Sequence, residues 1–116
     1  MPTELVYFIE AQWLNRIKIG RVWSTRGENR APARLSLMQP FSPVPLKLIG
    51  TTRQVGEYSL HILFREFCIH GEWFRASPLV RTFIRQIVSI KTPEEAANLC
   101  DIYQQILEAK EVIKRL

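Results

Sequence analysis

Short apolar runs separated by turn residues fill the first half of the chain and predict β-strands. Leu5 to Ile9 is an apolar, β-rich run, and Ile17 to Trp23 alternates apolar and polar residues as a half-buried strand does. Because only a short polar segment containing Asn15 separates these runs, we expect them to pair as a hairpin. Leu46 to Thr52 predicts another strand, and Glu72 to Arg75 predicts a short final one.

Two helices are predicted before the final strand. Pro32 suits the first position of a short helix from Ala33 to Gln39, which the following proline ends. A second helix is expected from Glu57 to about Ile69, with Gly71 after its end. Its apolar residues recur at helical spacing on one side: Leu60, Leu63, Phe64 and Phe67.

Two more helices are predicted after the final strand. Ser77 and Pro78 form a cap and first-turn pair that opens a helix reaching Val88. Thr92 and Pro93 repeat this pair and open a long C-terminal helix. The predicted apolar stripe of the C-terminal helix consists of Leu99, Ile102, Ile106, Ala109, Ile113 and Leu116.

The combination of a hairpin with several helices predicts an α+β fold around a small, mostly antiparallel sheet of three to four strands. The length of 116 residues suits a single folding unit. We expect one domain over residues 1–90 and an added amphipathic helix over residues 91–116. This helix either packs on its own domain or forms the contact of a homodimer.

Composition excludes several classes of protein. A hydrophobic share of 47% with 23% charged residues is typical of a folded globular protein. No apolar run is long enough to span a membrane, and the N-terminal segment lacks the pattern of a secretory signal. Cys68 and Cys100 are too few for a disulfide framework or a clustered zinc site. We therefore expect two reduced thiols in a cytoplasmic protein.

Positive charge is concentrated in one part of the sequence. The formal net charge is +5, and the segment from Arg16 to Arg53 contains a single acidic residue, Glu28. Its basic residues are Arg16, Lys18, Arg21, Arg26, Arg30, Arg34, Lys47 and Arg53. A basic patch on a small domain favours a polyanionic partner, and nucleic acid is the commonest one. A merely solubilising surface is the alternative.

An ordered set of short motifs runs through the first three quarters of the chain. Tyr7 is followed by Lys18-Ile19-Gly20-Arg21, Arg34-Leu35, Glu57 with Leu60-His61, and Gly71-Glu72-Trp73-Phe74. In their order and spacing these motifs resemble the GIY-YIG endonuclease superfamily, in the phage and large-virus branch that has KIG in place of YIG. The resemblance implies a metal-dependent endonuclease that hydrolyses DNA phosphodiester bonds. Double-stranded or branched DNA would be its partner in the cytoplasm, nucleoid or nucleus.

The resemblance also implies roles for single residues. Glu57 would hold one Mg²⁺ or Mn²⁺, a hard cation that takes water and phosphate oxygens as its other ligands. Arg34 and Arg21 would bind phosphate oxygens through their guanidinium groups. Tyr7 would accept a proton, and Lys18 on the paired strand would supply the cation that stabilises a phenolate. With lysine in place of the second tyrosine, a mechanism based on a tyrosine pair is not implied.

Further residues have open roles. His61 lies one turn after Glu57, so it could orient that carboxylate, carry a proton or contact phosphate, or it could be structural. Arg26 and Arg30 are candidate contacts to DNA phosphates, together with Arg21. Gly20 is expected to let backbone or phosphate approach the strand.

Each candidate also has a plain structural interpretation. Tyr7 could be a core aromatic, Lys18 and Arg34 surface charges, and Glu57 a favourable charge at a helix start. Trp73 and Phe74 are expected to pack in the core. The alternative function is a non-catalytic nucleic-acid binding module that uses the same basic face.

Overall fold

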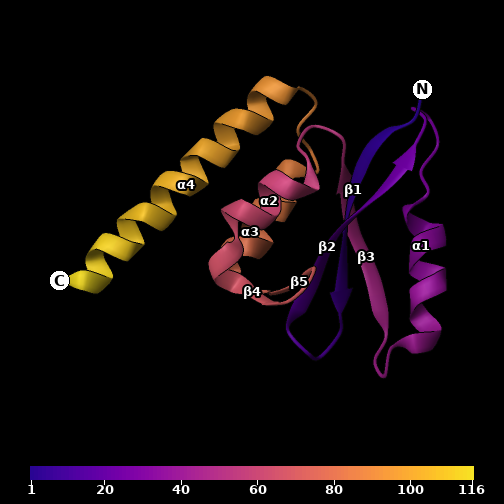
Figure 1. Cartoon of the computed structure of the whole chain (residues 1–116), viewed down its shortest axis with the longest axis horizontal. Coiled ribbons are helices and arrows are strands. Elements are labelled where there is room, and N and C mark those ends of the chain that lie inside the picture. The colour runs from indigo at the N-terminus through magenta and orange to yellow at the C-terminus, as the bar shows by residue number, and fades with distance from the viewer.

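The computed structural model describes residues 1–116 and is built on a five-stranded antiparallel sheet (Figure 1). The strands lie in the order β3-β1-β2-β5-β4. Their bounds are β1 (Thr3–Ala11), β2 (Arg16–Ser24), β3 (Leu46–Thr52), β4 (Cys68–His70) and β5 (Trp73–Arg75). The α+β class and the antiparallel sheet are confirmed, but the sheet has one strand more than the predicted maximum.

The predicted hairpin of β1 and β2 forms the centre of the sheet. The strands pair along their full length, with Tyr7 opposite Gly20 and Ile9 opposite Lys18. Trp13 and Asn15 adopt positive φ angles of 69° and 53° in the connecting turn. Asparagine tolerates this left-handed conformation better than most residues, which explains its position at the bend.

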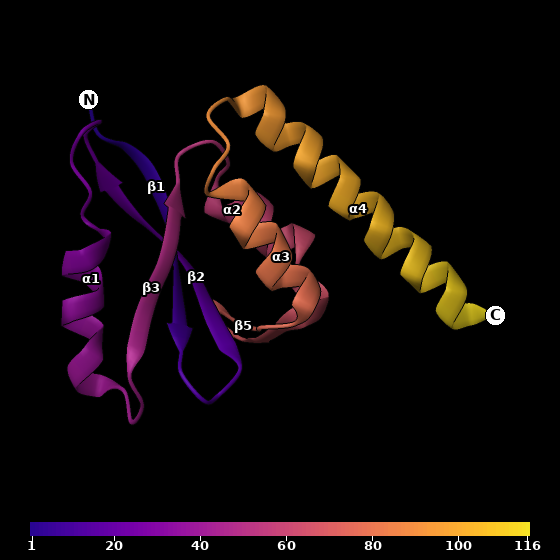
Figure 2. The same cartoon turned by 180° about the vertical axis from the view of Figure 1, so that it is seen from behind.

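The helices cover the two faces of the sheet unequally (Figures 1 and 2). One face carries only α1, whereas α2, α3 and α4 lie on the other side. The helices are α1 (Ala31–Met38), α2 (Glu57–Leu63), α3 (Pro78–Ile87) and α4 (Pro93–Arg115), with 3₁₀ turns η1 (Gln39–Phe41) and η2 (Arg65–Phe67). None of these helices combines the length and the hydrophobicity that crossing a bilayer requires.

Two of the helix starts agree with the predicted caps. The Ser77 hydroxyl accepts a hydrogen bond from the backbone N–H of Val80 at the start of α3. The Thr92 hydroxyl accepts one from the N–H of Glu95 at the start of α4. In both cases a proline follows the cap, as expected for a residue with no N–H to satisfy.

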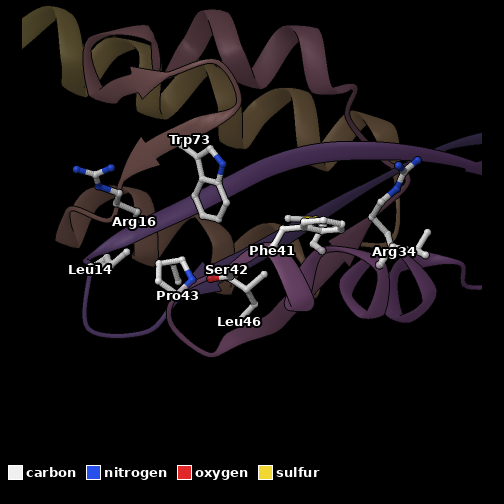
Figure 3. Close-up of a pocket in the computed structure, with 11 residues that line it drawn as sticks. Leu14, Arg16, Arg34, Phe41, Ser42, Pro43, Leu46 and Trp73 are labelled. Atoms are coloured by element: carbon white, nitrogen blue, oxygen red, sulfur yellow. The ribbon is translucent and has the colours of Figure 1, made fainter.

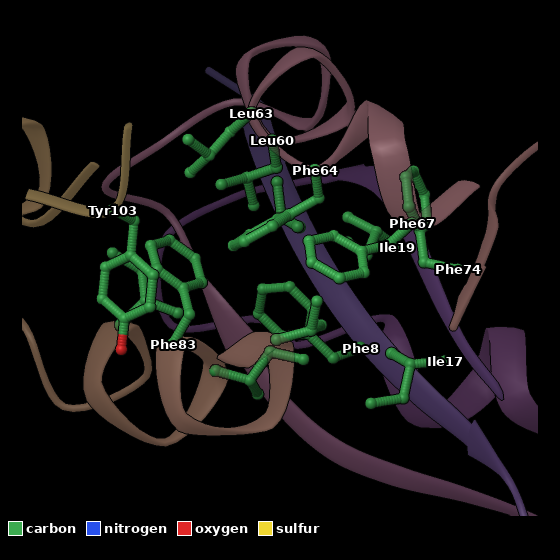
Figure 4. Packing of buried hydrophobic residues seen from close by; sticks show 14 of the residues in the cluster. Phe8, Ile17, Ile19, Leu60, Leu63, Phe64, Phe67, Phe74, Phe83 and Tyr103 are labelled. Carbon is green, nitrogen blue, oxygen red and sulfur yellow. The ribbon is translucent and has the colours of Figure 1, made fainter. Parts of the chain in front are cut away.

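The main core lies between the sheet and helices α2, α3 and α4 (Figure 4). It contains 18 buried residues, and Phe64 contacts the rings of Phe83 and Tyr103 at centroid distances of 4.9 and 6.5 Å. The core on the α1 face contains only five buried residues: Leu5, Tyr7, Ile9, Val22 and Ala31. Most of the hydrophobic stabilisation therefore comes from one side of the sheet.

The second predicted helix is wrong beyond Leu63. The chain continues as η2 and then as β4, which pairs with β5. The four residues of the predicted stripe are nevertheless all buried in the main core: Leu60, Leu63, Phe64 and Phe67. In a 3₁₀ turn, as in an α-helix, residues three or four apart lie on roughly the same side. The spacing of the apolar residues therefore did not distinguish a continued α-helix from a 3₁₀ turn.

The predicted apolar stripe of the C-terminal helix is also wrong, except at Leu99. Helix α4 packs on the domain through Ala96, Leu99, Tyr103 and Leu107. The other large apolar residues of the predicted stripe are exposed: Ile102, Ile106, Ile113 and Leu116. Tyr103 decides the orientation, because its ring lies 5.1 Å from that of Phe83 and its hydroxyl donates to the Gln86 side chain on α3.

Candidate active site

The candidate residues meet where strand β5 stops covering the edge of β2. Strand β5 pairs with β2 only through Arg16, Ile17 and Lys18. Beyond this point the Ile19 N–H donates to the Glu72 carbonyl at 2.9 Å, and the Nε2–H of His61 donates to the Ile19 carbonyl at 2.8 Å. Side chains and a turn, rather than a strand, therefore line this stretch of β2, and functional groups from several elements can approach it.

Tyr7 lies across Gly20 on the neighbouring strand. The Tyr7 side chain is buried, and a Cβ atom added to Gly20 would be only 2.4 Å from its Cζ and hydroxyl oxygen. Gly20 is thus required by the tyrosine ring, which corrects the prediction that it admits backbone or phosphate. The absence of a side chain at this position lets the phenol extend over β2 toward the uncovered edge.

Glu57 is the first residue of α2 and has an unusual environment. Its backbone N–H donates to the Glu4 carboxylate at 3.1 Å, which satisfies one free N–H of the helix start. Its Oε2 atom is buried without a hydrogen-bond partner, and Arg21 Nε lies 3.8 Å from it. A buried carboxylate oxygen without a donor destabilises the protein, so this arrangement calls for a functional explanation.

The pKa of the Glu57 carboxyl is raised above its ordinary value. Burial is the main cause, followed by the neighbouring Glu72 carboxyl group, while His61 and Arg21 partly oppose the shift. Two carboxyl groups held side by side favour a shared proton or a bound cation. Glu57 and Glu72 therefore form the acidic pair of the site.

Glu72 and Glu4 were not singled out from the sequence as site residues. Glu72 belongs to the turn between β4 and β5, and its partner Glu57 is brought there by α2. Only the Gly71-Glu72-Trp73-Phe74 motif pointed toward it. Glu4 gave a weaker signal, as an acidic residue beside an otherwise apolar strand.

The predicted partnership of Lys18 with Tyr7 is corrected by the structure. Lys18 lies opposite Ile9 in the hairpin, and its Nζ forms an ion pair of 3.2 Å with Glu72. The pKa of the Tyr7 phenol is raised, first by burial and then by the charge of Glu72. The cation that opposes this shift is Arg34. Tyr7 therefore keeps its proton at neutral pH and presents a hydrogen-bond donor.

His61 shares the helix face of Glu57, as expected from their spacing. Its Nε2 atom lies 3.5 Å from Glu57 Oε1, and its ring contacts the edge of Phe74 with a centroid distance of 5.0 Å. Because the hydrogen bond to the Ile19 carbonyl uses the Nε2–H, this nitrogen is a donor and cannot accept a proton. The geometry indicates that His61 fastens α2 to the edge of β2.

Arg34 reaches the site from α1 on the other face. Its side chain is exposed and lines a groove together with Trp73, as Figure 3 shows. Phe74 is buried in the main core as predicted, but Trp73 points to the opposite face and is only half-buried. The prediction that both aromatic residues belong to the core is therefore wrong for Trp73, since successive residues of a strand face opposite sides.

The remaining basic residues do not form one continuous patch. Arg26 and Arg30 lie between β2 and α1, and Arg30 is 3.9 Å from Glu28. Arg53 is used internally: its guanidinium donates to the backbone carbonyls of Thr3, Ser24, Thr25 and Glu28. Lys47 lines a hollow beside α3, on the opposite face from Arg34. The residues facing the α1 side are the best placed for an anionic partner.

The acidic groups at the site are few. No cluster of three or more His, Cys, Asp or Glu side chains is arranged to hold a metal ion. An ion bound at Glu57 would therefore take most of its ligands from water or substrate. Comparison with known proteins assigns no relationship, because no family model, curated protein or solved structure matches the chain.

Proposed function

We propose that the protein is a metal-dependent endonuclease that hydrolyses DNA phosphodiester bonds by a one-metal mechanism. The observation that carries the proposal is the buried, unbonded Oε2 of Glu57 beside the Glu72 carboxylate. Arg21 lies 3.8 Å from Glu57, and the Tyr7 phenol lies near enough to Glu57, Glu72 and Arg34 to respond to their charges, so residues of several elements come together here. This proximity supports the proposal, and a nuclease domain of the GIY-YIG type over residues 1–90 is part of it.

The oxygen atoms present suit Mg²⁺ or Mn²⁺. Glu57, with Glu72 beside it, would hold the ion, since hard cations prefer carboxylate oxygens and retain several waters. Such an ion supplies positive charge to the phosphate oxygens and lowers the pKa of a bound water. The raised pKa of Glu57 fits this role, because a bound cation relieves the repulsion between the two carboxylates.

The other residues act on the phosphate. Arg34 is exposed and its guanidinium can donate two parallel hydrogen bonds to phosphate oxygens. Arg21 lies between Glu4 and Glu57, at 3.6 and 3.8 Å, and half of its side chain is accessible to a ligand. The protonated Tyr7 phenol donates a hydrogen bond to a phosphate oxygen or orients the attacking water. Lys18 holds Glu72 in place through their ion pair.

Cleavage of supercoiled plasmid tests the proposal. The protein should nick the plasmid in Mg²⁺ or Mn²⁺ and leave it intact in EDTA. Glu57→Gln should abolish nicking, whereas the control Glu66→Gln, at an exposed carboxylate of η2, should nick as the parent does. DNA that is bound but not cut in either metal would instead support the non-catalytic binding module.

A further inference from the structure

A groove on the α1 face continues from the candidate active site. Its volume is about 510 Å³, within the range of ligand-binding clefts. Residues from the β1–β2 turn, α1, η1 and the start of β5 line it. Two residues that line the groove also connect it to the candidate active site. The positive charge of Arg34 is close enough to oppose the rise in the pKa of the Tyr7 phenol, and Trp73 directly follows Glu72 in the chain.

The lining of the groove combines aromatic rings with positive charge. Figure 3 shows Trp73 on one side and Phe41 on the other, with Arg16 and Arg34 toward the two ends. Phe41 and Leu37 are 89% and 68% exposed. Large apolar side chains left in water beside a cleft are typical of a binding surface rather than of a folding core.

Neither arginine is neutralised by the protein. The seven ion pairs of the structure involve other basic residues, so the guanidinium groups of Arg16 and Arg34 are both available to a ligand. No acidic residue lines the groove. A ligand that fits must therefore present a flat apolar surface and negative charge together.

We propose that this groove binds an unpaired DNA nucleotide next to the phosphate cleaved at the acidic pair. A nucleobase offers a planar face to Trp73 and Phe41, and its flanking phosphates offer partners for Arg16 and Arg34. A base inside a duplex has both faces stacked and cannot enter such a groove. The inference rests on the proposed nuclease function, and it assigns DNA with unpaired nucleotides as the substrate class: single strands, branches and the locally unwound tracts of a supercoiled plasmid.

Binding measured without cleavage tests this assignment. Fluorescence anisotropy in EDTA would compare one labelled oligonucleotide as a single strand, as a duplex and as RNA of the same sequence. We expect Phe41→Ala to weaken single-strand binding about 10-fold and to leave duplex binding unchanged. Ile113→Ala, which shortens an exposed apolar side chain on α4, is the matched control and should change neither affinity.

Four results would overturn the proposal. Equal losses for single strand and duplex, or no loss for either, would mean that Phe41 does not stack on an unpaired base. Tighter binding of the RNA strand would contradict the assignment to DNA. A Phe41→Ala change that converts a dimer to a monomer in light scattering, with DNA binding intact, would assign the groove to a second copy. Plasmid nicking that persists in any of these cases would leave the nuclease function standing.

Discussion

The two faces of the sheet differ in how completely they are covered. The face under α2, α3 and α4 has 18 buried residues with Phe64 and Phe83 at its centre, whereas the α1 face has five. The thinly covered face carries Tyr7, Arg34 and the groove, and the acidic pair lies at the edge of β2 within reach of that face. On the proposed function, stability and chemistry reside in separate parts of a very small protein, so substitutions should separate them.

The largest loss of stability is expected for Phe64→Ala in the main core. Phe64 is fully buried and contacts three other aromatic rings. Removing the ring leaves a cavity, and the free energy of unfolding should fall by about 3 to 5 kcal/mol in urea denaturation. Phe41→Ala on the α1 face, where the ring is 89% exposed, should change it by less than about 0.5 kcal/mol. Similar losses at the two positions would remove the contrast between the faces.

Gly20→Ala should affect both stability and cleavage. The new methyl group would overlap the Tyr7 ring, so the unfolding free energy should fall by about 1 to 3 kcal/mol. Displacing the phenol should also slow plasmid nicking about 100-fold. Gly50→Ala is a matched control, because its Cβ would be 2.4 Å from Val88 Cγ1, on the other face. If Gly50→Ala slows nicking as much as Gly20→Ala, the effect is one of stability alone.

Glu57→Gln should stabilise the protein at neutral pH. Because the pKa of Glu57 is raised in the folded state, the folded protein favours the neutral carboxyl, and this stabilisation is present at low pH and lost as pH rises through that pKa. Glutamine stays neutral, so the free energy of unfolding of the variant should exceed that of the parent by about 1 kcal/mol at pH 7. Thermal denaturation from pH 4 to 8 would measure the difference. A gain that grows toward low pH would contradict the sign of the shift.

Arg34→Lys should have the smallest effect on stability. The side chain is exposed, so the unfolding free energy should stay within about 0.5 kcal/mol of the parent. Lysine cannot reproduce the bidentate contact to phosphate, and cleavage in single-turnover assays should fall about 100-fold. Arg85→Lys, at an exposed position on α3, is the control. Unchanged cleavage by Arg34→Lys would mean that this arginine is only a surface charge.

Strands and helix starts that depend on residues close together in the chain were predictable from the sequence. An apolar run and an alternating run joined by a short polar segment predicted the β1–β2 hairpin, and a capping residue followed by proline predicted the starts of α3 and α4. The acidic pair was not predictable, because Glu57 and Glu72 meet only through the order of β2, β5 and α2 in space. The apolar spacing also could not predict which face of α4 packs on the domain, because the helix has two overlapping apolar stripes. Tyr103 selects one of them by contacting α3.

The most direct test of the account compares stability and nicking in the same two variants, Glu57→Gln and Phe64→Leu. Each would be assayed with Mg²⁺ at a temperature at which both are folded, beside a urea denaturation curve. We expect opposite results: Glu57→Gln is more stable than the parent and does not nick, whereas Phe64→Leu is less stable and still nicks. Nicking by Glu57→Gln, or nicking that simply follows stability in both variants, would contradict the assignment of chemistry to the acidic pair at the edge of β2.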